Sequence, residues 1–525
     1  MPGGMENEEA VATGITGLSL SYEEFLTSAQ GQKKPLIISV CAESPLPAIS
    51  PADAYSLLCH GKGVLLESLE GSEKIATYSY VGITPRLMVT IGDEMECKGD
   101  ERYLPITGVP DGNNAVDQIK SVMQKFNFVS QKQSLRVPRF SGGMAGYFSY
   151  DIISSLYPHV EIKGRGESST PLAEFMLISD YLVFDHSAKK LYIFCNPLLT
   201  EDSDPAIEYE KSIRRISAIR EALTEAEAGE AAEESVVKRE RSLHSPEKLQ
   251  CRSNISKDEF EMAVEQVSEY IHAGEILQAV ISQRMECEVH ADPLDIYRVL
   301  REANPSPYMY YLDFGERKVV GSSPEMLVRV ENEVASTVPI AGTRPRGRNS
   351  TEDTELAEEL LKDEKECAEH LMLVDLARND LGSVCEYGTV TLSDFMEIEK
   401  FSHVQHIVST VQGELRADLD CYETLKACFP AGTVSGAPKI RAMQIIDDLE
   451  RSRRGIYAGA VGWIGFNRNL EFAIAIRTIL LERKKAYLQV GAGIVADSVP
   501  EREWEETLNK AAGMLKAIEI AEGIL

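Results

Sequence analysis

Two Glu-x-x-Glu pairs are the residues of this chain whose type and spacing most clearly suggest chemistry. Glu366 and Glu369 lie in the stretch DEKECAEHLMLVDLARNDLG, and Glu503 and Glu506 lie in PEREWEETLNKAAGMLKAI. On a helix, residues three or four positions apart share one face, so each pair would continue an inward-facing stripe. Buried carboxylates require a counter-charge, and four of them on two facing helices would suit a hard divalent cation. A small site of oxygen ligands favours Mg²⁺ over Ca²⁺.

The same residues also have plainer explanations, which the spacing leaves open. A chain with 83 acidic residues contains many solvated glutamate pairs. Asp363 and Glu366 fit a variant of the capping box that starts a helix, and Gly382 stands where that helix would be capped. Lys510 is either an i,i+4 partner of Glu506 or a cation available to an anionic substrate.

Three other polar residues lie in apolar surroundings. Arg477 is part of the apolar run FAIAIRTIL, which predicts a strand, and a buried guanidinium needs a carboxylate from the protein or from a ligand. Glu325 in GSSPEMLVRV is flanked by apolar residues, so burial should raise its pKa above about 4.3, as a general acid requires. His406 lies in a strand-like run, where a hydrogen-bonded core histidine is the ordinary alternative.

Three glycine-rich segments accompany these residues. GTVSGAPK at 432–439 lacks the Walker A spacing, which argues against a nucleotide-binding loop. GTRPRG at 342–347 also fits a simple turn. GAGIVADS at 491–498 leads from a predicted strand into the second acidic helix, where backbone N–H groups can approach an anion. Ser498 and Glu501 fit a capping box at the start of that helix.

Composition limits the classes of protein to consider. The chain has 525 residues, 43% of them hydrophobic, and no apolar run long enough to cross a bilayer. A net charge of −29 argues against nucleic acid or an anionic membrane as partner, and any anionic substrate needs a locally positive site. The start of the chain lacks the features of a signal peptide, and the ten cysteines have no regular spacing, which indicates reduced thiols in the cytoplasm.

Short strands joined by polar turns dominate the pattern, with helices inserted rather than alternating. This arrangement predicts antiparallel meanders and an α+β fold. Residues 20–220 form a predicted N-terminal domain, the charged stretch 221–255 a linker, and residues 256–522 a second domain. The second domain opens with a capping box at Ser256 and Glu259, in a helix that Gly274 should end.

Six sequence blocks together resemble the chorismate-utilising enzymes and, within that superfamily, the family of anthranilate synthase large subunits (component I). The blocks are PIAGTRPRG, DEKECAEHLMLVDLARNDLG, PAGTVSGAPK, YAGAVG, AIRT and GAGIVADSVPEREWEET. The resemblance spans about Ser256 to Ile520 and is weaker in the N-terminal half. It implies a β-sandwich of antiparallel sheets with helices packed outside.

Two positions distinguish between members of the superfamily. Isochorismate-forming relatives have a lysine that activates water, where this chain has Gln278 in ILQAVISQR. Aminodeoxychorismate synthases typically read PIKGT with a nucleophilic lysine, where this chain has Ala341 in PIAGT. Both departures favour direct attack by ammonia, with anthranilate and pyruvate as products.

The resemblance also implies roles for individual residues. Glu325 would protonate the departing 4-hydroxyl of chorismate, and His406 would help remove the C2 proton. The four glutamates would hold Mg²⁺, directly or through water. The substrate-binding residues would be Thr433, Tyr457, Arg477, Gly491, Gly493 and Lys510.

Regulation and partners are implied in the same way. Tryptophan would bind as a feedback inhibitor at Ser68, Lys74, Pro307, Tyr308 and Met309, which makes the N-terminal domain regulatory. The chain has no Gly-x-Cys-x-Gly glutaminase elbow. A glutamine amidotransferase subunit (component II) would therefore supply ammonia, in a heterotetramer of two large and two small subunits. The alternatives are aminodeoxychorismate synthase component I and a non-catalytic tryptophan-sensing subunit.

Overall fold

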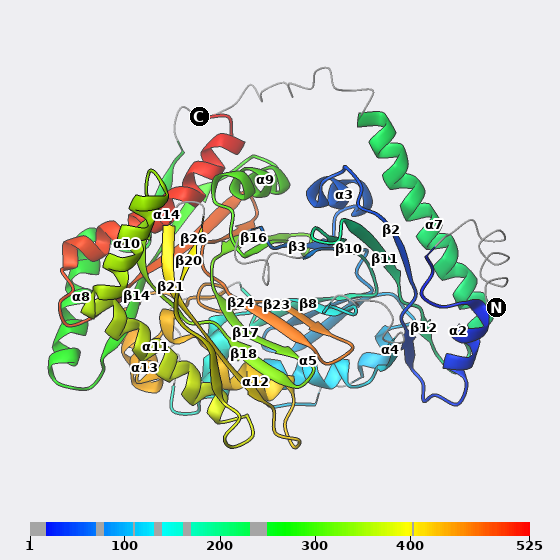
Figure 1. Ribbon diagram of the computed structural model, residues 1–525, viewed down its shortest axis with the longest axis horizontal. Coiled ribbons are helices and arrows are strands. Elements are labelled where there is room, and N and C mark those ends of the chain that lie inside the picture. Colours follow the sequence, from blue (N-terminus) through cyan, green and yellow to red (C-terminus); the bar gives the residue numbers. More distant parts are fainter. Residues whose placement is uncertain are drawn as a thin grey trace.

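Two large antiparallel sheets lie face to face at the centre of the molecule (Figure 1). The computed structural model describes residues 17–69, 78–108, 111–130, 139–160, 170–230, 249–401 and 404–524. In spatial order the strands of the first sheet are β13 (Cys251–Ser253), β14 (Gln278–Glu288), β26 (Lys485–Ile494), β25 (Thr478–Glu482), β16 (Arg317–Ser323), β15 (Tyr308–Asp313), β3 (Gly63–Glu67), β4 (Tyr78–Ile83), β10 (Asp180–Asp185), β11 (Lys190–Cys195) and β2 (Cys41–Pro45), with β22 (Gly436–Ala437) beside β14.

The second sheet is built in the same way. Its strands are β19 (Ile340–Pro345), β21 (Val404–Glu414), β18 (Val334–Thr337), β17 (Met326–Glu331), β24 (Leu470–Ile474), β23 (Ala460–Gly465), β8 (Gly143–Phe148), β9 (Ala173–Ile178), β5 (Leu87–Ile91) and β6 (Met95–Gly99), with β20 (Thr391–Lys400) beside β21. A third, small sheet contains β12 (Leu198–Leu199), β1 (Leu36–Ile38) and β7 (Asn127–Val129).

Helices cover the outer faces of this sandwich (Figure 1). The helices that pack on the first sheet are α3 (Pro51–Leu58), α7 (Pro205–Glu230), α8 (Lys257–His272), α9 (Pro293–Ala303), α13 (Lys439–Leu449) and α14 (Pro500–Ala521). Those that pack on the second are α4 (Leu104–Thr107), α5 (Ala115–Met123), α10 (Ser350–Lys362), α11 (Glu364–Gly382) and α12 (Cys421–Cys428). The other helical segments are α2 (Tyr22–Ala29), α6 (Ile153–Leu156), η1 (Tyr150–Ile152) and η2 (Gly432–Val434).

Strand β15 shows how the sequence produces these layers. Side chains alternate between the two faces of a strand. Met309 and Tyr311 enter the apolar cluster beneath the helices, whereas Tyr310 and Leu312 enter the cluster between the sheets. Both faces are buried, so the strand YMYYLD is apolar almost throughout. The expected β-sandwich with helices outside is confirmed.

Both sheets run through the two halves of the chain. Strand β15 pairs with β3, which places Tyr310 opposite Leu66, and β23 pairs with β8, which places Gly462 opposite Gly146. The division at 221–255 stays a prediction, but its first ten residues belong to helix α7, and 231–248 lie outside the described residues.

Several local predictions are confirmed and others are wrong. The capping box of Ser256 with Glu259 starts α8, and Gly274 follows its end at a φ of +76°. Asp363 caps α11 through the Glu366 amide. Gly382, however, is the last helical residue of α11, with Ser383 after it, because no left-handed turn is needed there. The cap predicted at Ser498 is also absent, since α14 begins after Val499 and the Ser498 hydroxyl accepts from the Val495 amide.

The single strand predicted around FAIAIRTIL is in fact two. β24 ends at Ile474 in the second sheet and β25 begins at Thr478 in the first, so the chain crosses between sheets in between. The prediction of reduced thiols also needs correction, because Cys251 and Cys287 form a disulfide between the paired strands β13 and β14. In the part of the chain that is described, no helix is long and apolar enough to span a bilayer.

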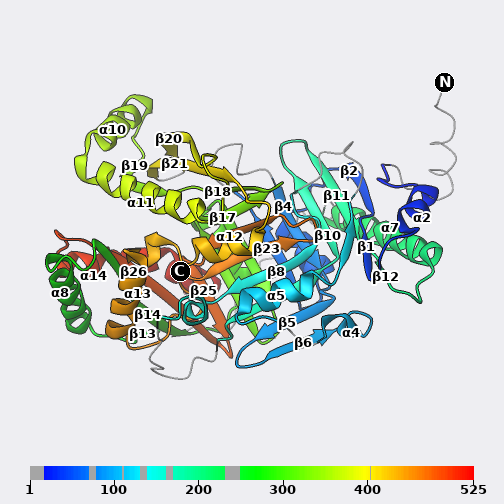
Figure 2. The same cartoon turned by 90° about the horizontal axis from the view of Figure 1, so that it is seen from below.

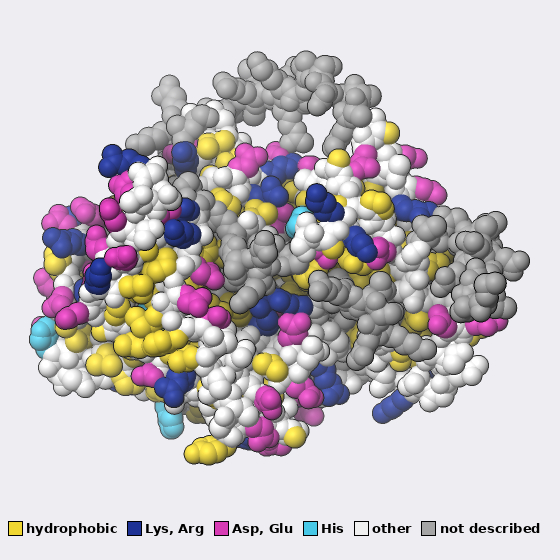
Figure 3. Space-filling model, viewed as in Figure 1, with side chains coloured by type: hydrophobic (Ala, Val, Ile, Leu, Met, Phe, Trp, Pro, Cys, Tyr) yellow, Lys and Arg dark blue, Asp and Glu magenta, His cyan; other side chains and the backbone are white. Residues whose placement is uncertain are grey.

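Acidic side chains are spread over the face of the molecule that Figure 3 shows. An apolar area is visible over α11 and β20, where Leu371, Leu392 and Phe395 are exposed.

Candidate active site

A cavity of about 370 Å³ brings together three residues that the sequence singled out, Glu325, His406 and Arg477. It lies where β19 and β21 of the second sheet approach segments 304–307 and 322–325. Pockets for small molecules typically measure roughly 300–1,000 Å³, so one small organic substrate fits.

Glu325 lies in the turn between β16 and β17 and is partly buried in the wall of the cavity. Burial raises its pKa to about 8, and the Thr433 hydroxyl and the charge of Lys510 offset part of this rise. Thr433, in the short helix η2, donates a hydrogen bond to Glu325 Oε1 at 3.0 Å. A carboxyl with this pKa is largely protonated at neutral pH and can therefore donate a proton to a substrate.

His406 lies in β21, and its ring lines the cavity. One of its two ring nitrogens, Nδ1, is hydrogen-bonded to the protein. Nδ1 lies 2.7 Å from the Gly342 carbonyl and 3.2 Å from Thr343 Oγ1. A carbonyl can only accept, so Nδ1 carries the proton and Nε2 is the basic nitrogen. Burial lowers the His406 pKa, and Arg477 lowers it further, although the Gly342 carbonyl opposes the change. The neutral imidazole can accept a proton.

Arg477 lies at the crossing between β24 and β25, with a φ of +50°. Among the described residues its guanidinium has no ion-pair partner. Burial lowers its pKa, while the Tyr457 hydroxyl and Glu506 favour its charged form. An anionic ligand in the cavity would supply the missing partner.

Two glycines of β26 leave room for polar groups. A Cβ at Gly491 would lie 2.5 Å from the Tyr457 hydroxyl, and a Cβ at Gly493 would lie 2.8 Å from Gln278 Nε2. Lys510 Nζ donates to the Gly491 carbonyl at 2.9 Å. In an antiparallel strand the N–H and C=O of one residue point to the same edge, so the Gly491 N–H points toward Lys510 as well. These groups form a donor-rich edge suited to a carboxylate.

The four glutamates lie on α11 and α14, and the charge of Glu506 on α14 reaches Glu369 on α11. Burial raises the pKa of Glu369, and the charges of Glu366 and Glu506 raise it further while Lys365 opposes them. Burial also raises the pKa of Glu503, with a contribution from Glu506. Carboxylates from two helices thus experience one another's charge. Figure 2 shows α11 and α14 on the same side of the molecule.

These side chains fit a hard cation in their chemistry, but they do not enclose one. No group of three or more Asp, Glu, His or Cys in the described ranges is arranged to hold a metal ion by itself. Water or a ligand carboxylate would have to complete the coordination, as is usual for Mg²⁺. The plainer explanation of Lys510 is confirmed, since it pairs with Glu506 at 2.6 Å. Of the capping box proposed for Asp363 and Glu366, the structure has the Asp363 cap, while the Glu366 carboxylate lies 3.5 Å from Arg344.

Sequence reasoning missed two residues of this region. Arg344, in the segment first considered only as a turn, forms ion pairs with Glu359, Asp363 and Glu366. Gln278 was considered only because it replaces the lysine of isochorismate-forming relatives. In the structure its side-chain amide lies beside Gly493. The only signal for Arg344 would have been a charged residue within the GTRPRG segment.

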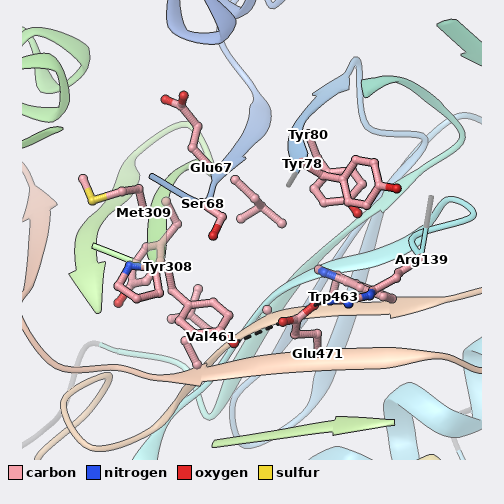
Figure 4. Close-up of a pocket in the computed structure, with 15 residues that line it drawn as sticks. Glu67, Ser68, Tyr78, Tyr80, Arg139, Tyr308, Met309, Val461, Trp463 and Glu471 are labelled. Carbon is pink, nitrogen blue, oxygen red and sulfur yellow. Dashed lines mark hydrogen bonds and ion pairs between the residues drawn. The ribbon is translucent and has the colours of Figure 1, made fainter. Parts of the chain in front are cut away.

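A second, narrower cavity of about 60 Å³ holds four of the five residues assigned to tryptophan (Figure 4). These are Ser68, Pro307, Tyr308 and Met309. Lys74 lies outside the described residues. The other side of the cavity, which the sequence did not predict, includes Arg139, Trp463 and Glu471, and the Tyr308 hydroxyl donates to Glu471 at 3.1 Å.

Comparison with known proteins agrees with this geometry. The family described as chorismate binding enzyme matches residues 67–516. Anthranilate synthase component 1 of Acetivibrio thermocellus is 46% identical over 461 residues, which cover 87% of this chain and 90% of the relative. The protein of the same name from Aquifex aeolicus is 47% identical over 463 residues, with the same coverage of both chains.

Solved structures have the same fold. Anthranilate synthase component I from Streptococcus pneumoniae superposes with a TM-score of 0.66 at 34% identity, covering 90% of this chain and 99% of that one. A menaquinone-specific isochorismate synthase from Escherichia coli superposes with a TM-score of 0.65 at 19% identity, covering 95% and 98%. The second likeness concerns the fold alone.

Proposed function

This chain belongs to the family of chorismate binding enzymes, and from that premise we propose that it is an anthranilate synthase component I, which converts chorismate and ammonia to anthranilate and pyruvate. This is the first committed step of tryptophan biosynthesis. The observation that carries the proposal is the cavity that Glu325, His406 and Arg477 share. Burial raises the pKa of Glu325 to about 8, and the Arg477 guanidinium has no ion-pair partner among the residues that the structure describes.

The cavity can hold a dicarboxylate in one orientation. Arg477, the Tyr457 hydroxyl and the donor edge at Gly491 and Gly493 would bind the enolpyruvyl carboxylate, while Lys510 and Thr433 contact the substrate beside them. The ring carboxylate would then point toward the glutamates of α11 and α14. A strongly acidic protein thus gains a locally positive place for an anion.

Two proton transfers follow from this orientation. Glu325 gives its proton to the 4-hydroxyl, which departs as water while ammonia bonds to C2. His406 Nε2 then takes the C2 proton as the bond to the enolpyruvyl oxygen breaks, which makes the ring aromatic. The enolpyruvyl group leaves as the enolate of pyruvate, which takes up a proton at its methylene carbon to become pyruvate. Neither Gln278 nor Ala341 offers a base or nucleophile for the rival reactions.

The cofactor in this proposal is Mg²⁺. Glu366, Glu369, Glu503 and Glu506 would hold it, directly or through water, and it would neutralise the ring carboxylate. Arg344 positions Glu366 from the opposite side, in an ion pair of 3.5 Å.

The test is a turnover assay with chorismate and ammonium, followed by product fluorescence and mass. Anthranilate and pyruvate in equal amounts are expected. Accumulated aminodeoxychorismate would assign the chain to aminodeoxychorismate synthase component I instead. A chain that binds chorismate or tryptophan but turns nothing over would be a sensing subunit.

We further propose that tryptophan inhibits the enzyme at the second cavity. Pairing of β3 with β15 brings Ser68 next to Pro307, Tyr308 and Met309. Because the cavity measures only about 60 Å³, an amino acid must widen it. Pro307 also lines the active-site cavity, so a shift of segment 305–309 would reach both.

Ammonia would come from a glutamine amidotransferase subunit, because this chain has no glutaminase elbow and its relatives are named component 1. We propose a cytoplasmic heterotetramer of two large and two small subunits. Sedimentation of the mixed subunits, and glutamine-dependent turnover only in the mixture, would test this assembly.

A further inference from the structure

A cavity of about 290 Å³ beside helix α7 is lined by cations far in excess of acids. Among the residues that the structure describes, five cationic side chains line it, against two carboxylates, so these side chains carry three positive charges in excess. The cations are Arg86, Arg102, Lys211, Arg214 and Arg215, and the acids are Asp180 and Glu208. The protein as a whole carries a net charge of −29, so a cavity lined mainly by cations differs from its average surface.

The two carboxylates are shared rather than paired one to one. Asp180, almost fully buried, contacts Arg86 at 2.8 Å and also Arg215. Glu208 contacts Lys211 at 2.7 Å and Arg102 at 3.6 Å. Outside the lining, Asp100 and Glu210 contact the cations only at 3.6 to 4.0 Å. Each shared acid therefore leaves one cation incompletely neutralised.

Helix α7 adds a second observation. Lys211, Arg214 and Arg215 occupy positions i, i+3 and i+4, which places three cations on one helical face. Like charges at this spacing destabilise an isolated helix. A bound dianion would remove that repulsion.

We propose that this cavity binds a small molecule through a phosphate group. A phosphate matches an excess of positive charge with up to two negative charges, and its oxygens accept the paired N–H groups of arginine. Tyr103 and Leu198, both buried, form an apolar part of the wall that could hold the rest of the ligand. The volume limits that ligand to a small metabolite.

The site is separate from both cavities described above. All its lining residues lie between Arg86 and Arg215, and it shares none with the active-site cavity or with the cavity at Ser68. A phosphorylated metabolite bound here would act on the N-terminal half without competing for chorismate.

The experiment measures binding of inorganic phosphate to the full chain by calorimetry, with ionic strength held constant by sodium chloride. Saturable binding of one phosphate per chain is expected, with malonate at least tenfold weaker. The double substitution Arg102→Gln with Lys211→Gln should weaken phosphate binding at least tenfold, because both side chains are half exposed and removable without opening the core. The matched control Arg416→Gln should leave the affinity unchanged.

Further arms separate this proposal from the proposed function. Phosphate binding should persist in Arg477→Gln, and chorismate turnover should persist in the double variant. Arg102→Lys, which keeps the charge but loses the planar fork, should bind with intermediate affinity and serves if the double variant unfolds. Equal affinity for malonate, an unchanged affinity in the double variant, or loss of binding in Arg477→Gln would each overturn the proposal.

Discussion

The Thr433 hydroxyl donates a hydrogen bond of 3.0 Å to Glu325, from a segment 108 residues further along the chain. Thr433 belongs to η2 and Glu325 to the turn before β17, so the contact joins two elements that have no local reason to meet. It holds one carboxyl oxygen of Glu325, Oε1, in place. The other oxygen is left to carry the proton.

Glu325→Gln should abolish turnover while leaving chorismate binding nearly intact. The amide keeps the shape and the contact with Thr433 but has no acidic proton, and general acid catalysis contributes roughly 10²–10⁴-fold. Steady-state turnover and calorimetric chorismate binding measure the two effects. Glu397→Gln, on the exposed strand β20, is the control with unchanged activity. A Glu325→Gln enzyme that turns over at the normal rate would remove Glu325 from the role of acid.

The pH profile should report the same group. The pKa of Glu325 is raised to about 8, so the acid form is present below that pH and is lost as pH rises through it. At a fixed concentration of free ammonia, turnover should therefore fall above pH about 8. Thr433→Val removes the hydrogen bond that lowers this pKa, so its alkaline limb should move to higher pH. A limb that stays in place, or moves down, would contradict the assignment.

Local signals in the sequence predicted local features of the fold. The spacing of Ser256, Glu259 and Gly274 located α8, because caps act within one helical turn. The glutamate pairs were correctly placed on helices, α11 and α14. The same reasoning failed at Ser498, where the hydroxyl accepts from the Val495 amide instead.

Contacts distant in sequence left no such signal. Strand periodicity indicates which face is buried but not which strand is its neighbour, so the pairing of β3 with β15 could not be foreseen. Arg477 appeared to lie within a strand because apolar residues flank it on both sides. In the structure those flanks belong to two different sheets, and the arginine occupies the crossing.

His406→Ala should separate the two proton transfers. Addition of ammonia does not need the imidazole, whereas loss of the C2 proton does, so an aminated, non-aromatic intermediate should be released. Mass spectrometry of the quenched reaction would detect it. Slow formation of anthranilate alone, with no intermediate, would show that another group removes the proton.

Removal of Mg²⁺ with EDTA should stop turnover, and addition of excess Mg²⁺ should restore turnover. Glu369→Gln should raise the Mg²⁺ concentration for half-maximal activity about tenfold or more, because an amide replaces a charged ligand and 1.4 kcal/mol corresponds to a factor of ten. Glu364→Gln, exposed on the same helix, is the matched control. If both variants respond to Mg²⁺ like the parent enzyme, the ion does not bind between α11 and α14.

Ser68→Ala should relax inhibition by tryptophan without changing the uninhibited rate. Ser68 lines the narrow cavity just after the end of β3, and its hydroxyl would bind a charged group of the inhibitor (Figure 4). A hydrogen bond to a charged group contributes about 1.5–3 kcal/mol, so half-inhibition should need roughly tenfold more tryptophan or beyond. Inhibition curves for Ser68→Ala and for Ser44→Ala, on β2 outside the cavity, measure the difference. Identical curves would mean that tryptophan binds elsewhere. Pro307 would then not transmit tryptophan binding from the narrow cavity to the active-site cavity.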